Sequence, residues 1–290
     1  MKDYVIVTES TCDLPVQIVN ELDIKVIPMN FELEGRSYTH YYDARELDIH
    51  DFYESLKKGE KSTTSLVNTE AFISFFEPIV KEGKDILYIA FSSGLSGTYS
   101  ASLIAIEELQ ESYQDTKIIA VDTKGASVGE GLMVYSAAMK KKAGYTLEEL
   151  SEWIQQNVLN LCHWFTVDDL NHLRRGGRVS ALSATLGTAL NVKPILHVDD
   201  EGHLIPISKV RGRKKSLYEL LDHMVETCTN PEDQVIFIGH GDTLEDAKFL
   251  AGLIREKLNV KEIYISPIGP VIGTHSGPGT IALFFFGTKR

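Results

Sequence analysis

Short apolar runs rich in Ile and Val alternate with longer segments whose apolar residues recur at helical spacing, and this alternation strongly limits the possible folds. The predicted strands are residues 4–7, 24–31, 86–91, 117–121, 164–167, 194–198, 235–238, 263–265 and 281–286. The clearest helices predicted between them are residues 128–143, 147–159, 216–228 and 244–258. Strands that alternate with helices indicate an α/β fold, with a mainly parallel sheet in the first half of the chain.

Two predicted helices in succession end the first half, and we place a boundary there between two domains, residues 1–160 and 161–290. A chain of 290 residues is long enough for one or two domains. Turn signals at Glu34-Gly35 and around Gly202 separate strand-like runs and predict β-hairpins. We therefore expect an N-terminal α/β domain with a mainly parallel sheet flanked by helices. The C-terminal α/β domain should be α+β-like, with a mixed sheet.

The acidic charge balance argues against several classes of partner. Lys plus Arg number 29 against 41 Asp plus Glu, which gives a net charge of -12. Such a charge repels nucleic acid and anionic lipid, so we expect no nucleic-acid partner and at most transient membrane contact. No apolar run approaches the ~18 residues of a membrane span, and the N-terminal run is too short for a signal peptide.

The cysteines favour a reducing compartment. Cys12, Cys162 and Cys228 are widely spaced and include no Cys-x-x-Cys pair. Reduced thiols and a cytoplasmic location are the simplest interpretation of this pattern.

A serine-rich turn between a predicted strand and a predicted helix is the best candidate for a ligand cradle. The strand-like run 85–91 passes directly into residues 92–100, SSGLSGTYS, which open a predicted helix to about Glu111. Free backbone N–H groups in a first helical turn favour an anionic oxygen, and Gly94 and Gly97 leave room for its approach. A distant glycine-rich stretch, 268–279, holds His275 among tight turns. If the fold brings the two together, an acid-binding site follows.

Two further polar stretches have both structural and functional interpretations. In residues 8–15, Thr11 or Asp13 could cap a helix with Pro15 in its first turn, or line a ligand crevice at the carboxyl end of the first strand. Residues 62–65, STTS, precede a predicted helix capped by Asn68, and four consecutive hydroxyls exceed what one cap requires.

An alternative interpretation is an α/β serine hydrolase or acyltransferase, with Ser96 or Ser93 as nucleophile and His275 as base. The spacing does not match the Gly-x-Ser-x-Gly elbow of hydrolases. The chain also lacks a phosphate-binding Gly-x(4)-Gly-Lys-Ser/Thr loop, a dinucleotide fingerprint after a strand and a His-Glu-x-x-His motif. We therefore expect no metal and no cofactor, and any phosphoryl chemistry would have to come from a partner protein.

Two basic clusters interrupt the acidic background. The first spans 174–178 and contains Arg174, Arg175 and Arg178, and the second spans 209–215 and contains Arg211 and Arg213. A solvated face is one interpretation, and nucleic-acid binding would require interleaved aromatic residues that neither cluster has. Docking to an acidic patch on a protein partner is the third.

Taken together, these motifs resemble the DegV family of bacterial fatty-acid-binding proteins, which serve as the acyl-carrying subunit of fatty acid kinase. The resemblance spans nearly the whole chain and rests on residues 8–15, 63–65, 92–99, 121–127, 173–180, 191–196 and 268–279. It implies two α/β domains with a long-chain fatty acid between them and the acyl-tail pocket in the C-terminal domain.

The resemblance also assigns roles to single residues. It implies that Thr64, Ser96 and His275 bind the fatty-acid carboxylate, in agreement with the cradle, where Ser93 and Gly97 are further candidates. It implies a protein with no catalytic activity of its own, which presents the acid to an ATP-dependent fatty acid kinase for acyl phosphate formation and phospholipid synthesis. The two basic clusters are then candidate kinase-docking sites. Family members often have Thr-Thr-Ser-Gln-Pro where this chain continues with Leu66 and Val67, a difference at the expected tunnel entrance.

Overall fold

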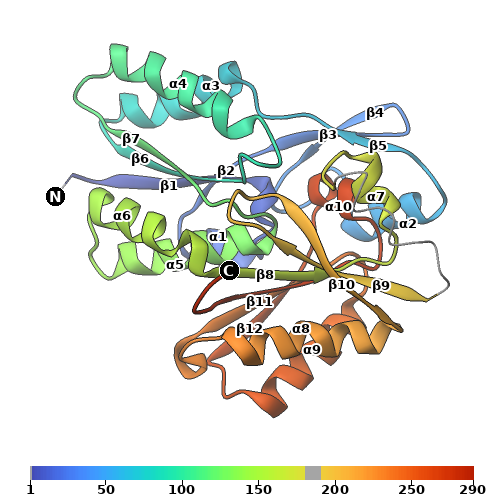
Figure 1. Ribbon diagram of the computed structural model, residues 1–290. Helices are drawn as coiled ribbons and strands as arrows, with labels where there is room; N and C mark the ends of the chain where they lie inside the picture. The colour runs from blue at the N-terminus through green and yellow to red at the C-terminus, as the bar shows by residue number, and fades with distance from the viewer. Residues whose placement is uncertain (1, 180–190) are drawn as a thin grey trace.

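A computed structural model describes residues 2–179 and 191–290 and shows helices and sheets stacked in layers (Figure 1). Helices α3 and α4 cover one face of a first sheet, α5 and α6 lie between the first and second sheets, and α8 and α9 cover the far face of the second. The bounds of these helices are Thr69–Lys81, Thr98–Ser112, Val128–Lys142, Leu147–Asn157, Arg213–Thr227 and Leu244–Lys257. The α/β class predicted from the alternation is confirmed.

The first sheet is parallel, as predicted for the first half of the chain. Its four strands have the order β2-β1-β6-β7 and the bounds Lys25–Ile27, Tyr4–Glu9, Asp85–Ala90 and Ile118–Asp122. Every residue of β1 and β6 is buried, because helices cover both faces of these central strands. The carboxyl ends of β1, β6 and β7 therefore point to one edge of the sheet, where ligands of open α/β sheets bind.

The second sheet is mixed, again as predicted. Its six strands have the order β10-β9-β8-β13-β11-β12, and only the β11–β12 pair among them is parallel. Their bounds are Leu204–Arg211, Val192–Val198, Leu161–Thr166, Ile281–Phe286, Val235–His240 and Glu262–Pro267. The predicted hairpin around Gly202 joins β9 to β10.

A small antiparallel sheet, β4-β3-β5, was only partly predicted. Its strands are Arg36–His40, Met29–Leu33 and Ser62–Thr64. The hairpin at Glu34-Gly35 is confirmed, because it joins β3 to β4. The single strand predicted over 24–31 is wrong: Pro28 has no N–H for a ladder and separates β2, in the parallel sheet, from β3 in the small one. The hydroxyl-rich run 62–64 forms strand β5 of this sheet.

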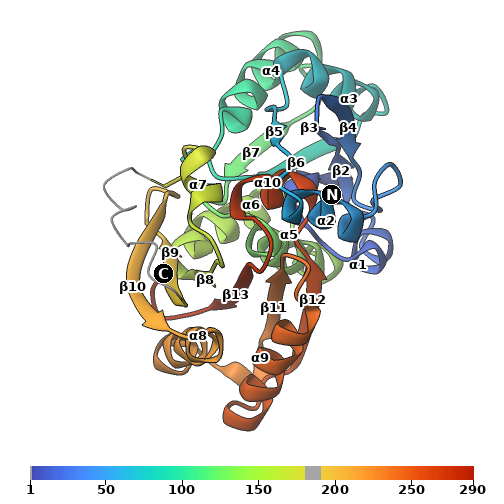
Figure 2. The same cartoon turned by 90° about the vertical axis from the view of Figure 1, so that its right-hand side faces the viewer.

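The remaining helices that the structure describes are shorter. They are α1 (Val16–Glu21), α2 (Ile49–Lys57), α7 (Asn171–Arg175) and α10 (Pro270–Ser276), with single 3₁₀ turns at Ser10–Cys12, Val158–Asn160 and Pro231–Asp233. Figure 2 shows α10, from the end of the chain, beside α2, from its beginning, and the two helices are in contact.

The helix caps test two predictions. The Asn68 side chain accepts a hydrogen bond from the Ala71 N–H and caps α3, as predicted. The cap predicted at Thr11 or Asp13 is wrong, because α1 begins after Pro15 without a side-chain cap. Asp13 instead accepts hydrogen bonds from the Gly269 N–H at 2.9 Å and the Ser127 hydroxyl at 2.6 Å.

Helix α5 is shared by the two main sheets. It contacts β1 and β6 of the parallel sheet and β8, β11 and β13 of the mixed sheet, and its Leu132, Met133 and Val134 are buried. A Cβ at Gly129 would lie 2.5 Å from the Phe284 ring, so a glycine there allows the helix to approach the mixed sheet closely. One hydrophobic core therefore runs through both halves. The division at 160/161 separates the sheets and stays a proposal as a domain boundary.

No helix in the described part of the chain is both long enough and apolar enough to cross a bilayer.

Candidate functional site

A cavity of about 270 Å³ lies where the carboxyl ends of β1, β6 and β7 meet α10 and the mixed sheet. The loops after these three strands contribute Thr11, Ser96 and Ser127 to its wall, and α10 contributes His275. Residues from both ends of the chain thus line one cavity, because α10 packs against β3 and β5 of the first half.

The polar end of this cavity contains most of the residues predicted to bind a carboxylate. The Thr64 Oγ1 atom, at the end of β5, lies 2.8 Å from His275 Nε2 on α10. Ser96 and Gly97 belong to the same wall, and the Ser96 hydroxyl lies 2.9 Å from the Thr98 hydroxyl in the first turn of α4. The structure therefore brings Thr64, Ser96, Gly97 and His275 to one cavity, and their binding of a carboxylate stays a prediction.

Ser93 lies outside this group. Its side chain is exposed, and its hydroxyl donates to Asp122 Oδ2 at 2.6 Å. Ser93 is not part of the cavity wall. Ser93 and Ser96 therefore point to different sides of the turn, which the sequence alone did not distinguish.

Arg178, which we expected on a docking surface, is instead part of the cavity wall. Its Nε donates to the Leu95 carbonyl oxygen at 3.2 Å, whereas Arg174 and Arg175 are exposed on α7. The preceding Gly177 has a φ of +69° and turns the chain between the exposed pair and Arg178. The glycine pair within RRGGR is the sequence feature that could have indicated that the chain turns before the third arginine, so that it points differently from the first two.

The electrostatics of the polar end suit an anion. Burial and, to a smaller extent, the charge of Arg178 lower the pKa of His275 to about 4, so its imidazole is neutral near pH 7. Burial also lowers the pKa of Arg178. Among the residues that the structure describes, no acidic side chain forms an ion pair with Arg178. A partly buried cation without a counter-ion, beside hydroxyl donors, favours a bound carboxylate.

The rest of the cavity is mostly apolar, and the mixed sheet forms one part of its wall. Side chains alternate along β8 and β13, so that Phe165, Ala282 and Phe284 face the cavity, whereas Trp164 and Leu283 face α8 and α9. The remaining apolar lining is Met29, Leu66, Phe91, Leu95, Ala126, Leu173, Val198, Leu204, Ile268, Val271 and Ile272. A space of this shape suits a ligand with one polar end and an apolar chain.

The second basic cluster is only partly available for docking. Arg211 is exposed, as the prediction requires. Arg213 is mostly buried, and its Nε donates to Asp246 Oδ2 at 2.8 Å while its Nη1 lies 3.6 Å from Asp168. We therefore withdraw Arg213 as a docking residue, because its charge is paired within the fold.

The hydrolase alternative lacks the geometry that it needs. His275 Nε2 pairs with the Thr64 hydroxyl, and the hydroxyls of Ser96 and Ser93 pair with Thr98 and Asp122. Within the described chain, no serine hydroxyl is hydrogen-bonded to His275, although a nucleophile and its base must be in such contact.

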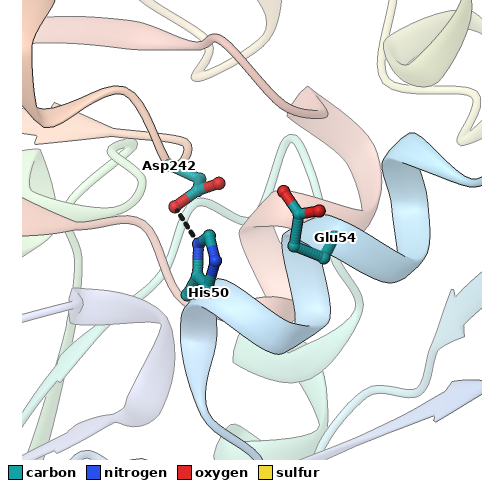
Figure 3. A group of neighbouring side chains, drawn as sticks. All are labelled: His50, Glu54 and Asp242. Carbon is teal, nitrogen blue, oxygen red and sulfur yellow. Dashed lines mark hydrogen bonds and ion pairs between the residues drawn. The ribbon is translucent and has the colours of Figure 1, made fainter.

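An ion-pair cluster that the sequence analysis missed joins the two halves outside the cavity. Figure 3 shows His50 and Glu54 on α2 facing Asp242 from the loop after β11. His50 Nδ1 lies 2.9 Å from Asp242 Oδ1, and Lys57 Nζ lies 2.5 Å from Asp242 Oδ2 and 2.9 Å from Glu54 Oε1. Lys57 contacts both carboxylates and His50 contacts Asp242, so we interpret the group as a salt-bridge network and not as a metal site. Its members are 192 residues apart at most, so no local motif could reveal it.

Known proteins are similar to this chain in sequence and in fold along nearly its whole length. A family model described as "Uncharacterised protein, DegV family" matches residues 3–288. A DegV domain-containing protein of Clostridium perfringens is 48% identical over 290 residues, which cover 100% of this chain and 99% of that relative. The structure of DegV from Bacillus subtilis, described as a fatty acid binding protein, has a TM-score of 0.84 and 30% identity, and covers 99% of this chain and 100% of its own.

A DegV family protein of Thermus thermophilus, described by its fatty acid binding, has a TM-score of 0.86 and 28% identity, with 99% of this chain and 100% of that chain covered. The family model and the Clostridium relative both extend over the loops that build the cavity. This chain belongs to the DegV family.

Proposed function

We propose that the chain binds one long-chain fatty acid in the cavity between the parallel and mixed sheets. The observation that carries this proposal is a single space with Thr64, Ser96, His275 and Arg178 at its polar end and apolar side chains over the rest. The carboxylate would accept hydrogen bonds at the polar end, and the acyl tail would lie against the mixed sheet. The descriptions of the Bacillus and Thermus relatives as fatty acid binding support the same assignment.

The acyl tail and the carboxylate of the ligand contribute differently to the binding free energy. Each buried methylene contributes ~0.8 kcal/mol, so roughly 14 of them contribute about 11 kcal/mol before the costs of association. A buried carboxylate costs several kcal/mol unless it is fully hydrogen-bonded. The tail therefore supplies affinity, and the polar end offsets the desolvation of the carboxylate and fixes its reacting oxygen.

We further propose that the chain presents the bound acid to a separate ATP-dependent fatty acid kinase in the cytoplasm. The acid would become an acyl phosphate for phospholipid synthesis, and the chain itself would act as a substrate-presenting subunit and not as an enzyme. The exposed Arg174 and Arg175 on α7, together with Arg211 on β10, are the proposed docking residues. Their side chains are not paired with acidic residues within the described chain, so they remain available to an acidic partner surface.

Native mass spectrometry, followed by denaturing extraction and identification of the released molecule, tests the binding proposal. A long-chain fatty acid at about one per chain is the expected result. A protein that is empty and also takes up no added fatty acid would contradict it. Labelling with a serine-reactive fluorophosphonate separates this outcome from a hydrolase, because a carrier should stay unmodified.

The presentation proposal predicts different effects of His275→Ala on two measurements. Acyl phosphate formation with a fatty acid kinase and ATP should fall more than fatty acid retention, because the tail dominates retention whereas the polar end orients the reacting oxygen. Arg211→Ala, outside the cavity, is the matched variant, and it should impair acyl phosphate formation without changing retention. Equal losses of both quantities in His275→Ala would argue against this division.

A further inference from the structure

Arg178 is the only charged side chain in the cavity wall that the structure describes. This wall contains no Asp, Glu or Lys, and its two histidines, His163 and His275, are neutral near pH 7 because burial lowers the pKa of each. Residues 180–190, which follow Arg178 closely in the chain, include no acidic residue. An anionic ligand in this cavity therefore meets one fixed cation, since a guanidinium stays protonated.

Two backbone carbonyl groups hold the Arg178 guanidinium beside the residues predicted to bind a carboxylate. Its Nε donates to the Leu95 carbonyl oxygen at 3.2 Å, and Leu95 directly precedes Ser96. Its Nη1 donates to the Gly176 carbonyl oxygen, and a Cβ at Gly176 would lie 2.2 Å from His275 Nδ1. The guanidinium is thus fixed between the Ser96 side and the His275 side of the polar end.

The guanidinium also keeps hydrogen-bond donors for a ligand. It has more N–H groups than the two carbonyl oxygens use. No further acceptor for these groups lies among the residues that the structure describes. Arg178 is only half-buried and lines the cavity, so a ligand group at the polar end can contact it.

The proposed kinase reaction moves negative charge away from the carboxylate. One carboxylate oxygen attacks the γ-phosphorus of ATP, an O–P bond forms, and the bond between this phosphorus and ADP breaks, so that ADP leaves with the electron pair. The acid is already ionised, so no proton is transferred. The attacking oxygen becomes the bridging oxygen of an acyl phosphate, and the charge then lies on the phosphoryl oxygens, at about −1.5 to −2 near pH 7.

The carboxylate and the phosphoryl group depend differently on a nearby cation. A carboxylic acid without a counter-ion can take up a proton on burial and become neutral. A phosphoryl group keeps negative charge near pH 7 and cannot escape the penalty in this way. The planar guanidinium also matches phosphoryl oxygens with two parallel hydrogen bonds. The single arginine of the cavity is therefore more important for the acyl phosphate than for the fatty acid.

On the basis of the proposed presentation of a fatty acid to a kinase, we propose that Arg178 is a catalytic residue that this chain contributes to phosphoryl transfer. Its guanidinium contacts the phosphoryl oxygens in the transition state and in the acyl phosphate, while Thr64 and Ser96 contact the acyl oxygen. An arginine that a second protein supplies in trans stabilises the transition state of other phosphoryl transfers in the same way.

A binding experiment without a kinase tests whether Arg178 recognises the phosphoryl group. The probes are hexadecanoic acid and the phosphonate analogue of hexadecanoyl phosphate, in which a methylene group replaces the bridging oxygen. Calorimetric titration of delipidated protein measures both affinities. Arg178→Gln should weaken phosphonate binding by about 100-fold or more, and this loss should be at least about tenfold larger than the loss for hexadecanoic acid.

Two further variants serve as controls. Arg178→Lys keeps the charge without the planar guanidinium, so it should retain part of the phosphonate affinity, and it also serves if the glutamine variant does not fold. Arg255→Gln removes an exposed arginine of α9 that does not line the cavity, and it should leave both affinities unchanged.

A preloaded complex tests the catalytic role separately. Protein that already holds hexadecanoic acid is mixed with a fatty acid kinase and ATP, and the acyl phosphate is measured over time. Arg178→Gln should form it at least about 100-fold more slowly than the wild type. Because both proteins begin with bound acid, a difference in fatty acid affinity does not produce this result.

The outcomes separate this inference from the functions on which it rests. If Arg178→Gln weakens both probes alike, Arg178 is only a counter-ion of the carboxylate, and the inference is overturned while fatty acid binding stands. An unchanged rate in the preloaded Arg178→Gln complex also overturns it. If the wild type binds hexadecanoic acid but forms no acyl phosphate, presentation to a kinase is overturned together with this inference. If the wild type does not bind hexadecanoic acid, fatty acid binding itself is overturned.

Discussion

Replacing Thr64 with valine removes one hydroxyl from the polar end of the cavity and changes little else. Valine has nearly the shape of threonine, and β-branched residues suit the short strand β5. The lost atom is Oγ1, which lies 2.8 Å from His275 Nε2 and which we propose contacts the carboxylate. The variant therefore tests the loss of the hydroxyl alone, with the backbone of β5 unchanged.

The expected magnitudes follow from the two hydrogen bonds that Thr64 can make. Loss of the neutral contact with His275 should lower the free energy of unfolding by about 1 kcal/mol. Loss of a charge-assisted bond to the carboxylate, worth about 1.5–2 kcal/mol, should weaken fatty acid binding roughly 10- to 30-fold. Calorimetric titration of delipidated protein measures the affinity, and denaturant unfolding measures the stability.

Ser62 offers a matched control on the same strand. Its hydroxyl lies 2.7 Å from the Thr274 hydroxyl, so it joins β5 to α10 just as Thr64 does, but it is not part of the cavity wall. Ser62→Ala should lose similar stability and keep its affinity for the fatty acid. If Ser62→Ala loses as much affinity as Thr64→Val, the effect is structural, and if neither loses affinity, Thr64 does not bind the carboxylate.

Two further predictions concern the residues that position the site. A Cβ at Gly176 would lie 2.2 Å from His275 Nδ1, so Gly176→Ala should displace the ring, lower the stability by about 1–3 kcal/mol and weaken fatty acid binding. Gly252→Ala in α9, where no atom lies within 4 Å of the new Cβ, should instead be neutral or stabilising by up to ~1 kcal/mol, and thermal unfolding distinguishes the two. Burial raises the pKa of Asp13 from 3.8 to about 7, because its effect is larger than that of the two hydrogen bonds that lower this pKa. Between these two pH values the folded protein therefore binds more protons than the unfolded chain. Asp13 therefore stabilises the fold less as the pH rises from about 4 to 7. Asp13→Asn, which keeps a side chain suited to the local φ of 49°, should gain stability relative to the wild type over that range, by a few kcal/mol at most. A gain that shrinks with rising pH in denaturant titrations would contradict the assigned pKa.

The periodic parts of the chain were predictable because local patterns determine them. Runs such as 86–91 and 281–286 are apolar on both faces, and buried central strands need that composition. The strand-to-helix turn that contains Ser96 was likewise visible from its serine- and glycine-rich composition between an apolar run and a helical segment. The position of His275 beside Thr64 was implied by the family resemblance alone, since 211 residues separate the two positions.

Other features depend on contacts that no local pattern encodes. Arg178 was grouped with Arg174 and Arg175 by its charge, although the turn at Gly177 directs it into the cavity. Asp13 was interpreted as a helix cap, but its carboxylate binds the N–H of Gly269 from the far end of the chain. In both cases the sequence contained the right residue type, and its partner came from a distant element.

The shared helix α5 limits how a bound molecule can leave. Separating the parallel sheet from the mixed sheet would expose fully buried side chains such as Met133 and Val134, each at a cost of about 1.5–3 kcal/mol. Leu66, by contrast, belongs to the cavity wall and is 49% exposed, so the short segment after β5 forms the rim between the cavity and solvent. A small displacement of this rim costs far less buried surface than parting the sheets. The architecture thus favours exchange of a bound molecule through a local displacement of residues 65–67 over a hinged opening of the whole molecule.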